Sequence, residues 1–212
     1  MSPRRTLEEA LETRERVLDA AFRVVRGAGG RFTVDAVAKE AGVSKGAVLH
    51  HFPSKEALAG GMLERQLDEF DGLIERRLAE EPEGRPGRWL RAYVRASFEV
   101  GAGDPAVNDA LLAAMATESG LLSSFEGRFE SWRRQAEVDG VDRTRANLVR
   151  LAVDGLATAE SFGIGAPEGE EREDLLEALI DLTTGQQTVG LEEDTGGAFR
   201  SAEAPGDGMS DL

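Results

Sequence analysis

Residues 33–55 gather the side chains that are best suited to bind an anion. The three lysines of the 212-residue chain, Lys39, Lys45 and Lys55, all fall within this stretch, and the other strongly basic residues are arginines. Thr33 and Ser44 add hydroxyl groups to the same stretch. Ammonium and hydroxyl groups are donors that proteins use to contact phosphate oxygens. A phosphate-bearing polymer such as DNA is therefore a partner that these residues could bind.

Catalytic and metal-binding chemistry has little support in the sequence. Cysteine is absent, and the two histidines, His50 and His51, are adjacent and cannot share one face of a helix. Asp and Glu are abundant but scattered, and we find no nucleophile paired with a base and no glycine loop of the kind that cradles phosphate. We therefore expect no metal, no cofactor and no enzymatic activity.

Charge is divided unevenly along the chain. The formal net charge is −15, which on average opposes DNA binding because phosphates need cationic partners. Residues 1–56, however, hold 10 Lys and Arg against 8 Asp and Glu, whereas the remainder holds 15 against 32. This partition predicts two parts of the chain with different functions.

The spacing of apolar residues predicts an all-α fold. They recur every three or four residues nearly throughout, and Gly or Pro clusters separate the segments. The helices are expected at residues 7–27, 34–41, 45–51, 55–80, 88–100, 105–119, 121–138, 143–162 and 170–184. The first of them is expected to bury one apolar face, made of Leu11, Val17, Leu18, Ala21, Phe22 and Val25.

Two short helices in residues 33–52, TVDAVAKEAGVSKGAVLHHF, have the pattern of a helix-turn-helix. Small residues are needed where the helices cross and turn, and Ala38 and Gly42 meet that need. Apolar contacts between the helices are expected from Val34, Val37, Val43 and Val48. The second helix would then expose the small or polar residues Ser44, Lys45, Gly46, Ala47 and His50. Such a face fits the major groove of double-stranded DNA.

Residues 32–58, FTVDAVAKEAGVSKGAVLHHFPSKEAL, resemble the DNA-binding signature of the tetracycline-repressor (TetR) family, and the resemblance covers roughly the first 60 residues. It implies that Thr33 and Lys55 bind phosphates and that the exposed residues from Ser44 to His50 face the groove. One departure is that Leu49 and His50 stand where the family usually places tyrosines. Leu49 cannot donate a hydrogen bond, so the resemblance leaves Thr33, His50 and Lys55 as the phosphate contacts.

The resemblance predicts an N-terminal three-helix helix-turn-helix domain and a C-terminal helical bundle for ligand binding and dimerisation. We place the first at residues 1–54 and the second at 55–189; residues 190–212 have the acidic, Gly- and Ser-rich composition of a disordered tail. Within the long helix 55–80, which would join the two, Gly60 and Gly61 either ease bending or allow close packing. No apolar run approaches the roughly 18 residues of a membrane span, and the N-terminus does not resemble a secretory signal. A cytoplasmic location without a membrane partner is expected.

The second domain is expected to sense a small molecule. The large side chains best able to line a pocket between its helices are Trp89, Tyr93, Phe98, Met115, Phe125, Phe129, Trp132 and Phe162. Core packing explains the same residues, because aromatic side chains at helical spacing usually pack together. Since Arg91, Arg95, Arg133 and Arg134 are expected on solvated faces, few buried cations are evident. An apolar or cationic effector is therefore expected.

A homodimer is also expected. Small and apolar residues follow one side of helix 143–162, and a second stripe follows helix 170–184. Two such helices from each subunit would build a four-helix interface, although packing within one chain is the alternative. The interface residues predicted in this way are Leu148, Ala152, Gly155, Leu156, Ala159, Leu175, Leu179 and Leu182.

These features predict a transcriptional repressor that a small-molecule effector releases from a palindromic operator. Two-fold symmetry would place two recognition helices about 34 Å apart, matching two half-sites. The alternative is a DNA-binding adaptor or activator whose C-terminal half binds a protein partner and no small ligand.

Overall fold

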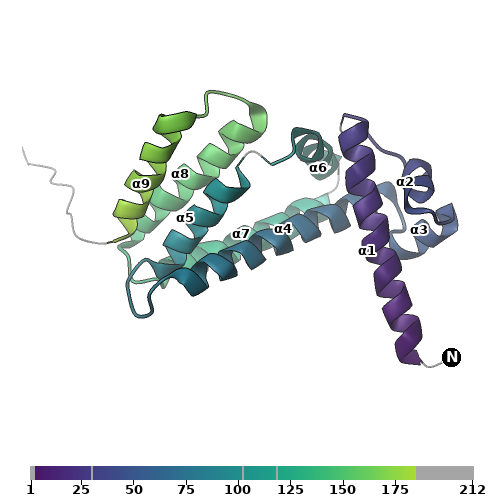
Figure 1. The fold of residues 1–212 in the computed structure, drawn as a ribbon, viewed down its shortest axis with the longest axis horizontal. Helices are drawn as coiled ribbons and strands as arrows, with labels where there is room; N and C mark the ends of the chain where they lie inside the picture. The colour runs from purple at the N-terminus through teal and green to yellow at the C-terminus, as the bar shows by residue number, and fades with distance from the viewer. Residues whose placement is uncertain (1–2, 30, 102, 118, 185–212) are drawn as a thin grey trace, which may run out of the picture.

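In the computed structural model, residues 3–29, 31–101, 103–117 and 119–184 are described, and all regular structure in these ranges is helical. The all-α prediction is confirmed. The predicted tail at 190–212 lies outside the described residues, and the domain boundaries remain a prediction. The helices are α1 (Pro3–Gly27), α2 (Val34–Ala41), α3 (Lys45–His51), α4 (Lys55–Glu80), α5 (Arg88–Val100), α6 (Pro105–Thr117), α7 (Ser119–Glu137), α8 (Arg143–Phe162) and α9 (Gly169–Thr183) (Figure 1).

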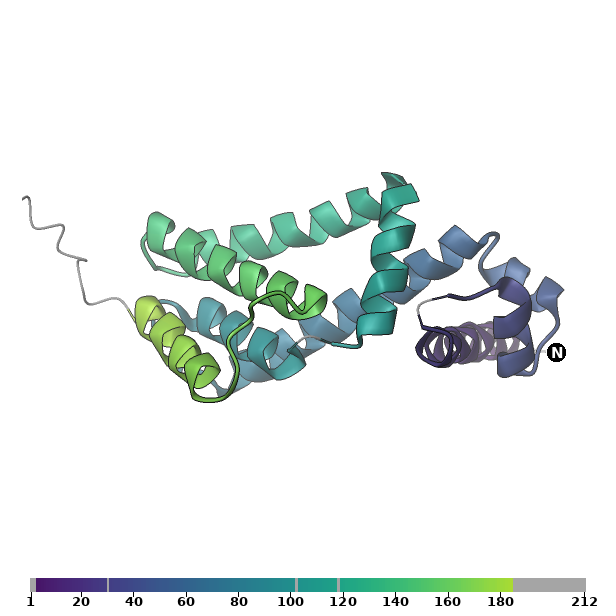
Figure 2. The same ribbon diagram turned by 90° about the horizontal axis from the view of Figure 1, so that it is seen from above.

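The molecule has a small head and a larger body joined by α4. Helices α1, α2 and α3 pack together at one end, and α5, α8 and α9 pack together at the other (Figures 1 and 2). Helix α4 runs from the head along the body, and α7 lies beside it. Helix α6 contacts both α1 and α4, so it is a second connection between head and body. No helix in the described part of the chain is long and apolar enough to cross a bilayer.

Side-chain caps fix the beginnings of the helices around the turn. The Thr33 hydroxyl accepts a hydrogen bond from the N–H of Ala36 at 3.1 Å, and the Ser44 hydroxyl accepts one from Ala47 at 3.1 Å. Such caps satisfy N–H groups that have no partner within the helix. Gly42 ends α2 with φ of 66°, a left-handed conformation that favours glycine. The short helices therefore begin and end where the sequence predicts.

The head packs closely on α4 at Gly61. A Cβ at this position would lie 2.5 Å from Cε1 of Phe52 and 3.3 Å from Cδ2 of Leu18. Phe52 and Leu18 are both buried, so Gly61 lies against the core of the head. Of the two roles expected for the glycine pair, the structure supports close packing at Gly61.

The first helix begins earlier than expected and corrects one core assignment. It starts at Pro3 instead of near residue 7, and Leu11 is 54% exposed although the sequence analysis placed it in the core. The reason is that the N-terminal turns of α1 project beyond α2 and α3, so no other helix covers them (Figure 1). The remaining residues of the predicted apolar face are buried.

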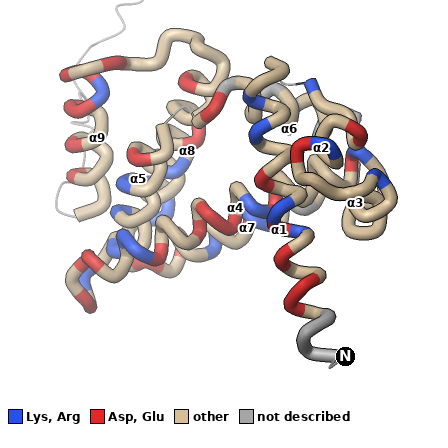
Figure 3. The backbone as a smooth tube through the Cα atoms, turned by 45° about the vertical axis from the view of Figure 1, so that its right-hand side comes forward, with Lys and Arg blue, Asp and Glu red and all other residues tan. Residues whose placement is uncertain are grey.

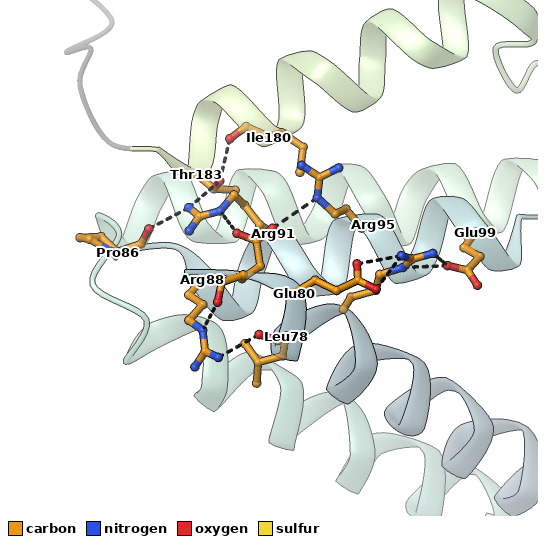
Figure 4. A network of polar contacts seen from close by, with 11 residues as sticks. Leu78, Glu80, Pro86, Arg88, Arg91, Arg95, Glu99, Ile180 and Thr183 are labelled. Carbon is orange, nitrogen blue, oxygen red and sulfur yellow. Dashed lines mark hydrogen bonds and ion pairs between the residues drawn. The ribbon is translucent and has the colours of Figure 1, made fainter. Parts of the chain in front are cut away.

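A buried ion pair joins the end of α4 to α5. Nε of Arg91 lies 2.7 Å from Oε2 of Glu81, and the two side chains are only 7% and 10% exposed. Arg91 also donates to the carbonyl oxygen of Pro86 at 2.8 Å, while Arg88 donates to that of Leu78 at 2.9 Å (Figure 4). The expectation that Arg91 lies on a solvated face is therefore wrong, because its guanidinium closes the junction between α4, α5 and the end of α9.

Candidate nucleic-acid interface and effector site

Helix α3 lies at the outer end of the head and is anchored by one apolar residue. Val48 is fully buried, whereas Ser44, Lys45, Gly46 and His50 are exposed. Of the predicted groove-facing residues, only Ala47 is half-buried. The helix therefore presents a small, polar outer surface with few bulky side chains, which is the shape needed to approach base edges in the major groove.

The two predicted phosphate contacts are both next to the buried residue Phe32. Thr33 is exposed at the start of α2, directly after Phe32. Nζ of Lys55 lies 4.9 Å from the centroid of the Phe32 ring, within cation–π range. Phe32 thereby holds the ammonium of Lys55 close to the start of α2. The ammonium of Lys55 is thus brought near the hydroxyl-bearing residue Thr33, which is 22 positions earlier in the sequence.

Arg31 adds a cation that the sequence analysis did not include. It is exposed two residues before Thr33, and it makes no ion pair within the described part of the chain. In the sequence, the only feature that could have identified Arg31 as a phosphate contact was its position next to Phe32 and Thr33 at the start of α2. Arg31 and Lys55 place two cations beside the first turn of α2, which also carries Asp35, and the head contains both basic and acidic residues (Figure 3).

Lys45, in contrast, has an acidic partner in the head. Its Nζ lies 2.8 Å from Oδ2 of Asp35, which is in the first turn of α2. Arg23 of α1 is paired in a similar way with Glu40 of α2, at 2.7 Å. The charge count of the head therefore overstates the number of cations that are free to meet phosphate.

The two histidines at the end of α3 differ in their surroundings. Their rings meet edge to face with centroids 5.3 Å apart, and His51 is half-buried whereas His50 is exposed. Burial, and then the nearby His50 and Arg14, lower the pKa of His51. His51 is therefore suited to packing in its neutral form, and His50 remains the histidine that can reach a phosphate or a base.

Most of the predicted ligand residues meet in one aromatic cluster of the body. The rings of Trp89 and Tyr93 are stacked at 5.3 Å between centroids, and those of Tyr93 and Trp132 are 5.9 Å apart. Phe129 and then Phe125 continue the cluster from Trp132 at successive separations of 4.9 and 4.5 Å. Phe70 of α4, absent from the predicted set, joins it 5.1 Å from Trp132.

Two predicted ligand residues, Phe98 and Phe162, are not part of this aromatic cluster. Phe98 packs under the guanidinium of Arg172, with Cζ of Arg172 4.6 Å from the ring centroid. Phe162 is 54% exposed at the end of α8. The side chain of Met115 lies outside the described part of the chain.

Polar groups line two edges of the aromatic cluster. On α8, Asp154 accepts hydrogen bonds from the Tyr93 hydroxyl at 2.5 Å and from Nη1 of Arg150 at 2.7 Å. Burial raises the pKa of Asp154 and also that of Tyr93. Nε of Arg150 is buried without a hydrogen-bond partner. Arg150 and the more deeply buried Arg91 are thus two largely buried cations of the body.

The second polar edge opens into a groove between α4 and α7. Asp71 accepts a hydrogen bond from Nε1 of Trp132 at 2.7 Å and is ion-paired with Arg128. The groove has a volume of about 570 Å³, and its lining includes Asp71, Glu64 and Asp68. Arg128 also lines this groove and pairs with both Asp68 and Asp71, so the groove beside the aromatic cluster has three carboxylates and one guanidinium.

The predicted dimer residues differ in exposure and fall into exposed, half-buried and buried sets. On α8, Leu148, Ala152 and Gly155 are exposed and lie on one face together with Leu151, which the sequence analysis omitted. Leu156 and Leu179 are instead buried within their own subunit. The half-buried members of the set are Ala159, Leu175 and Leu182.

A three-helix head that exposes its third helix, carried by a long helix to a larger helical body, defines a helix-turn-helix protein with an attached regulatory domain. Residues 17–62 match the family model described as bacterial regulatory proteins, tetR family, and residues 87–184 match the tetracyclin repressor-like, C-terminal domain. The chain belongs to the TetR family.

Related proteins support this assignment over different lengths. The HTH-type transcriptional regulator SrpR of Pseudomonas putida is 45% identical over 65 residues, which is 30% of this chain and 30% of SrpR. A solved transcriptional regulator from Rhodococcus sp. Rha1 is 29% identical and covers 80% of this chain and 95% of its own, with a TM-score of 0.59. The multidrug binding protein EbrR, solved with malachite green, shares the fold at 22% identity and a TM-score of 0.56, covering 80% and 97%. The chain spans only 30% to 48% of the length of the curated relatives SrpR and TtgW.

Proposed function

We propose that this protein is a dimeric transcriptional repressor whose α3 enters the major groove of an operator and whose body binds a small molecule that releases it. One observation carries the proposal: α3 is anchored by Val48 and leaves Ser44, Lys45, Gly46 and His50 exposed at the end of the molecule. The C-terminal family match disfavours the alternative of an adaptor that binds no small ligand.

Phosphate contacts would orient the head on the duplex. Lys55 lies over the ring of Phe32, and the two sequence neighbours of Phe32, Arg31 and Thr33, are exposed. In this arrangement the start of α2 meets the DNA backbone while α3 lies in the groove. His50 supplies the contact for which Leu49 has no suitable group.

A second copy of the chain would cover the exposed face of α8. Leu148 and Leu151 are each more than half exposed, and the small residues Ala152 and Gly155 beside them permit close helix approach. Two-fold pairing through this face, with α9 at its side, gives an isologous four-helix interface. The two heads would then bind the half-sites of a palindrome.

The effector is proposed to enter from the α4–α7 groove and open the aromatic cluster. Flat rings from α4, α5 and α7 suit an aromatic molecule, and the faces of the same rings also favour a cationic one. EbrR, which shares this fold, has been solved with malachite green. Binding would favour a head spacing that does not match the operator.

Footprinting of the purified protein on the DNA upstream of its own coding sequence tests the proposal directly. We expect a protected palindrome, and we expect an effector to abolish the protection. A thermal-shift screen of aromatic cations supplies candidate effectors, since a ligand that binds only the folded protein raises its melting temperature. Failure to retain any duplex at low salt would overturn the proposed function.

A further inference from the structure

The ion pair between Asp35 and Lys45 joins the two helices of the helix-turn-helix at their N-terminal ends. Asp35 is in the first turn of α2, and Lys45 is the first residue of α3. The two charged groups are 2.8 Å apart, and the side chains are 67% and 55% exposed. A carboxylate is therefore held directly beside the lysine that would enter or border the DNA groove.

The other exposed cations on α2 and beside it have no such carboxylate partner. Arg31 and Lys39 make no ion pair within the described residues, and Lys55 lies over the ring of Phe32. The carboxylate thus acts on one selected cation of the proposed interface. Because both partners are exposed, the pair is weak enough to exchange for an uncharged acceptor in the groove, whereas a phosphate approaching Lys45 would also be repelled by the carboxylate of Asp35.

We infer that Asp35 is a positioning residue that holds the ammonium of Lys45 away from DNA phosphates and thereby limits sequence-independent binding. This inference rests on the proposed DNA-binding function and adds a determinant of specificity to it. Each cation that neutralises a phosphate releases condensed counterions and makes binding tighter and more salt-dependent. A lysine retained by Asp35 adds little to this general attraction. It becomes useful at a site where an acceptor such as guanine O6 or N7 can replace the carboxylate.

The test measures binding of the full chain to a fluorescein-labelled duplex of random sequence by fluorescence anisotropy. Asp35→Asn is expected to tighten binding by about two- to tenfold at low salt and to steepen the slope of log K against log salt by about 0.9. Asp35→Glu, which keeps the charge, is expected to bind as the wild type does. A gain of affinity cannot result from loss of folding, so the expected result does not depend on the stability of the variant.

Two matched controls separate action through Lys45 from a general change of charge. In a Lys45→Ala background, Asp35→Asn should leave binding unchanged. Glu40→Gln makes the same charge change on the same helix, where the partner is Arg23, and should alter binding less than Asp35→Asn does. Equal tightening in the Lys45→Ala background, or an equal effect of Glu40→Gln, would overturn the inference.

The remaining outcomes distinguish this inference from the proposed function. If the wild type binds the duplex and Asp35→Asn binds with the same affinity and salt slope, the inference fails and the DNA-binding function stands. If the wild type binds no duplex at low salt, both fail together. Once an operator is known, Asp35→Asn should also lower the ratio of operator affinity to random-duplex affinity.

Discussion

Lys45 and Lys55 have the same functional group but different neighbours in the folded head. Lys55 lies over the ring of Phe32, whereas Lys45 is paired with Asp35. The sequence predicted that both residues lie on the DNA-binding surface, since spacing and caps determine which positions a short helix exposes. It could not predict their partners, because those depend on how α2 crosses α3 and on where Phe32 packs.

Lys55→Ala should weaken DNA binding by about 1 kcal/mol and reduce the salt slope by about 0.9, since one phosphate contact is lost. Anisotropy titrations over a range of salt concentrations measure both quantities. Arg134→Ala removes the same charge from an exposed position on α7 and is the control. Equal effects of the two substitutions would mean that Lys55 acts only through net charge.

We expect His51 to make the stability of the head depend on pH. Burial and neighbouring charges lower its pKa in the folded state, so between the folded and unfolded pKa values the unfolded chain binds more protons. The contribution of His51 is therefore present above about pH 6.5 and is lost as pH falls. Urea unfolding should show that the wild type loses more stability than His51→Gln between neutral pH and pH 5. Parallel losses in the two proteins would contradict this origin.

At the scale of elements, the sequence predicted the helices well because their ends are encoded locally. Thr33 and Ser44 cap α2 and α3 as expected, and Gly42 ends α2 in a left-handed conformation. The start of α1 was less predictable, since an exposed helix can extend for as long as its residues tolerate it. Leu11 was misplaced for the same reason, because periodicity alone does not show whether another element covers an apolar stripe.

Gly61→Ala should destabilise the protein by about 1 to 3 kcal/mol, because the new methyl group would overlap the buried ring of Phe52. Gly72→Ala on the same helix is the matched control. Its Cβ would meet only the end of Arg76 at 3.5 Å, so higher helix propensity should stabilise the protein by up to about 1 kcal/mol. Thermal or urea unfolding measures both changes. If both glycines behaved alike, close packing would not explain Gly61.

At the scale of the whole molecule, the sequence showed which faces are apolar but could not show which faces meet. The contact of α6 with α1 and the closure of α5 against α9 around Arg91 both join segments that are distant in the chain. Part of the predicted dimer stripe, including Leu156 and Leu179, is buried within the subunit for this reason. The aromatic cluster likewise combines Trp89 and Tyr93 of α5 with four rings from α4 and α7, and the sequence could not show that these helices meet.

Leu151→Glu should weaken self-association by about 100-fold or more, because each dimer would bury two additional carboxylates. Leu7→Glu places the same charge at a residue of similar exposure on the projecting end of α1 and should leave the dimer intact. Sedimentation velocity over a range of concentrations measures the dissociation constants. A dimer that tolerates Leu151→Glu would show that subunits pair through another surface.

The continuity of α4 has a geometric consequence for any signal that reaches its far end. This helix has 26 residues, so it is a rod about 39 Å long. Pivoting such a rod by about 5° shifts its opposite tip by about 3.4 Å, which is close to the rise of one base pair along B-form DNA. A small side-chain rearrangement within the body could thus tilt α4 enough to displace the head by about one base pair along the duplex. Such a displacement would not require a change of fold.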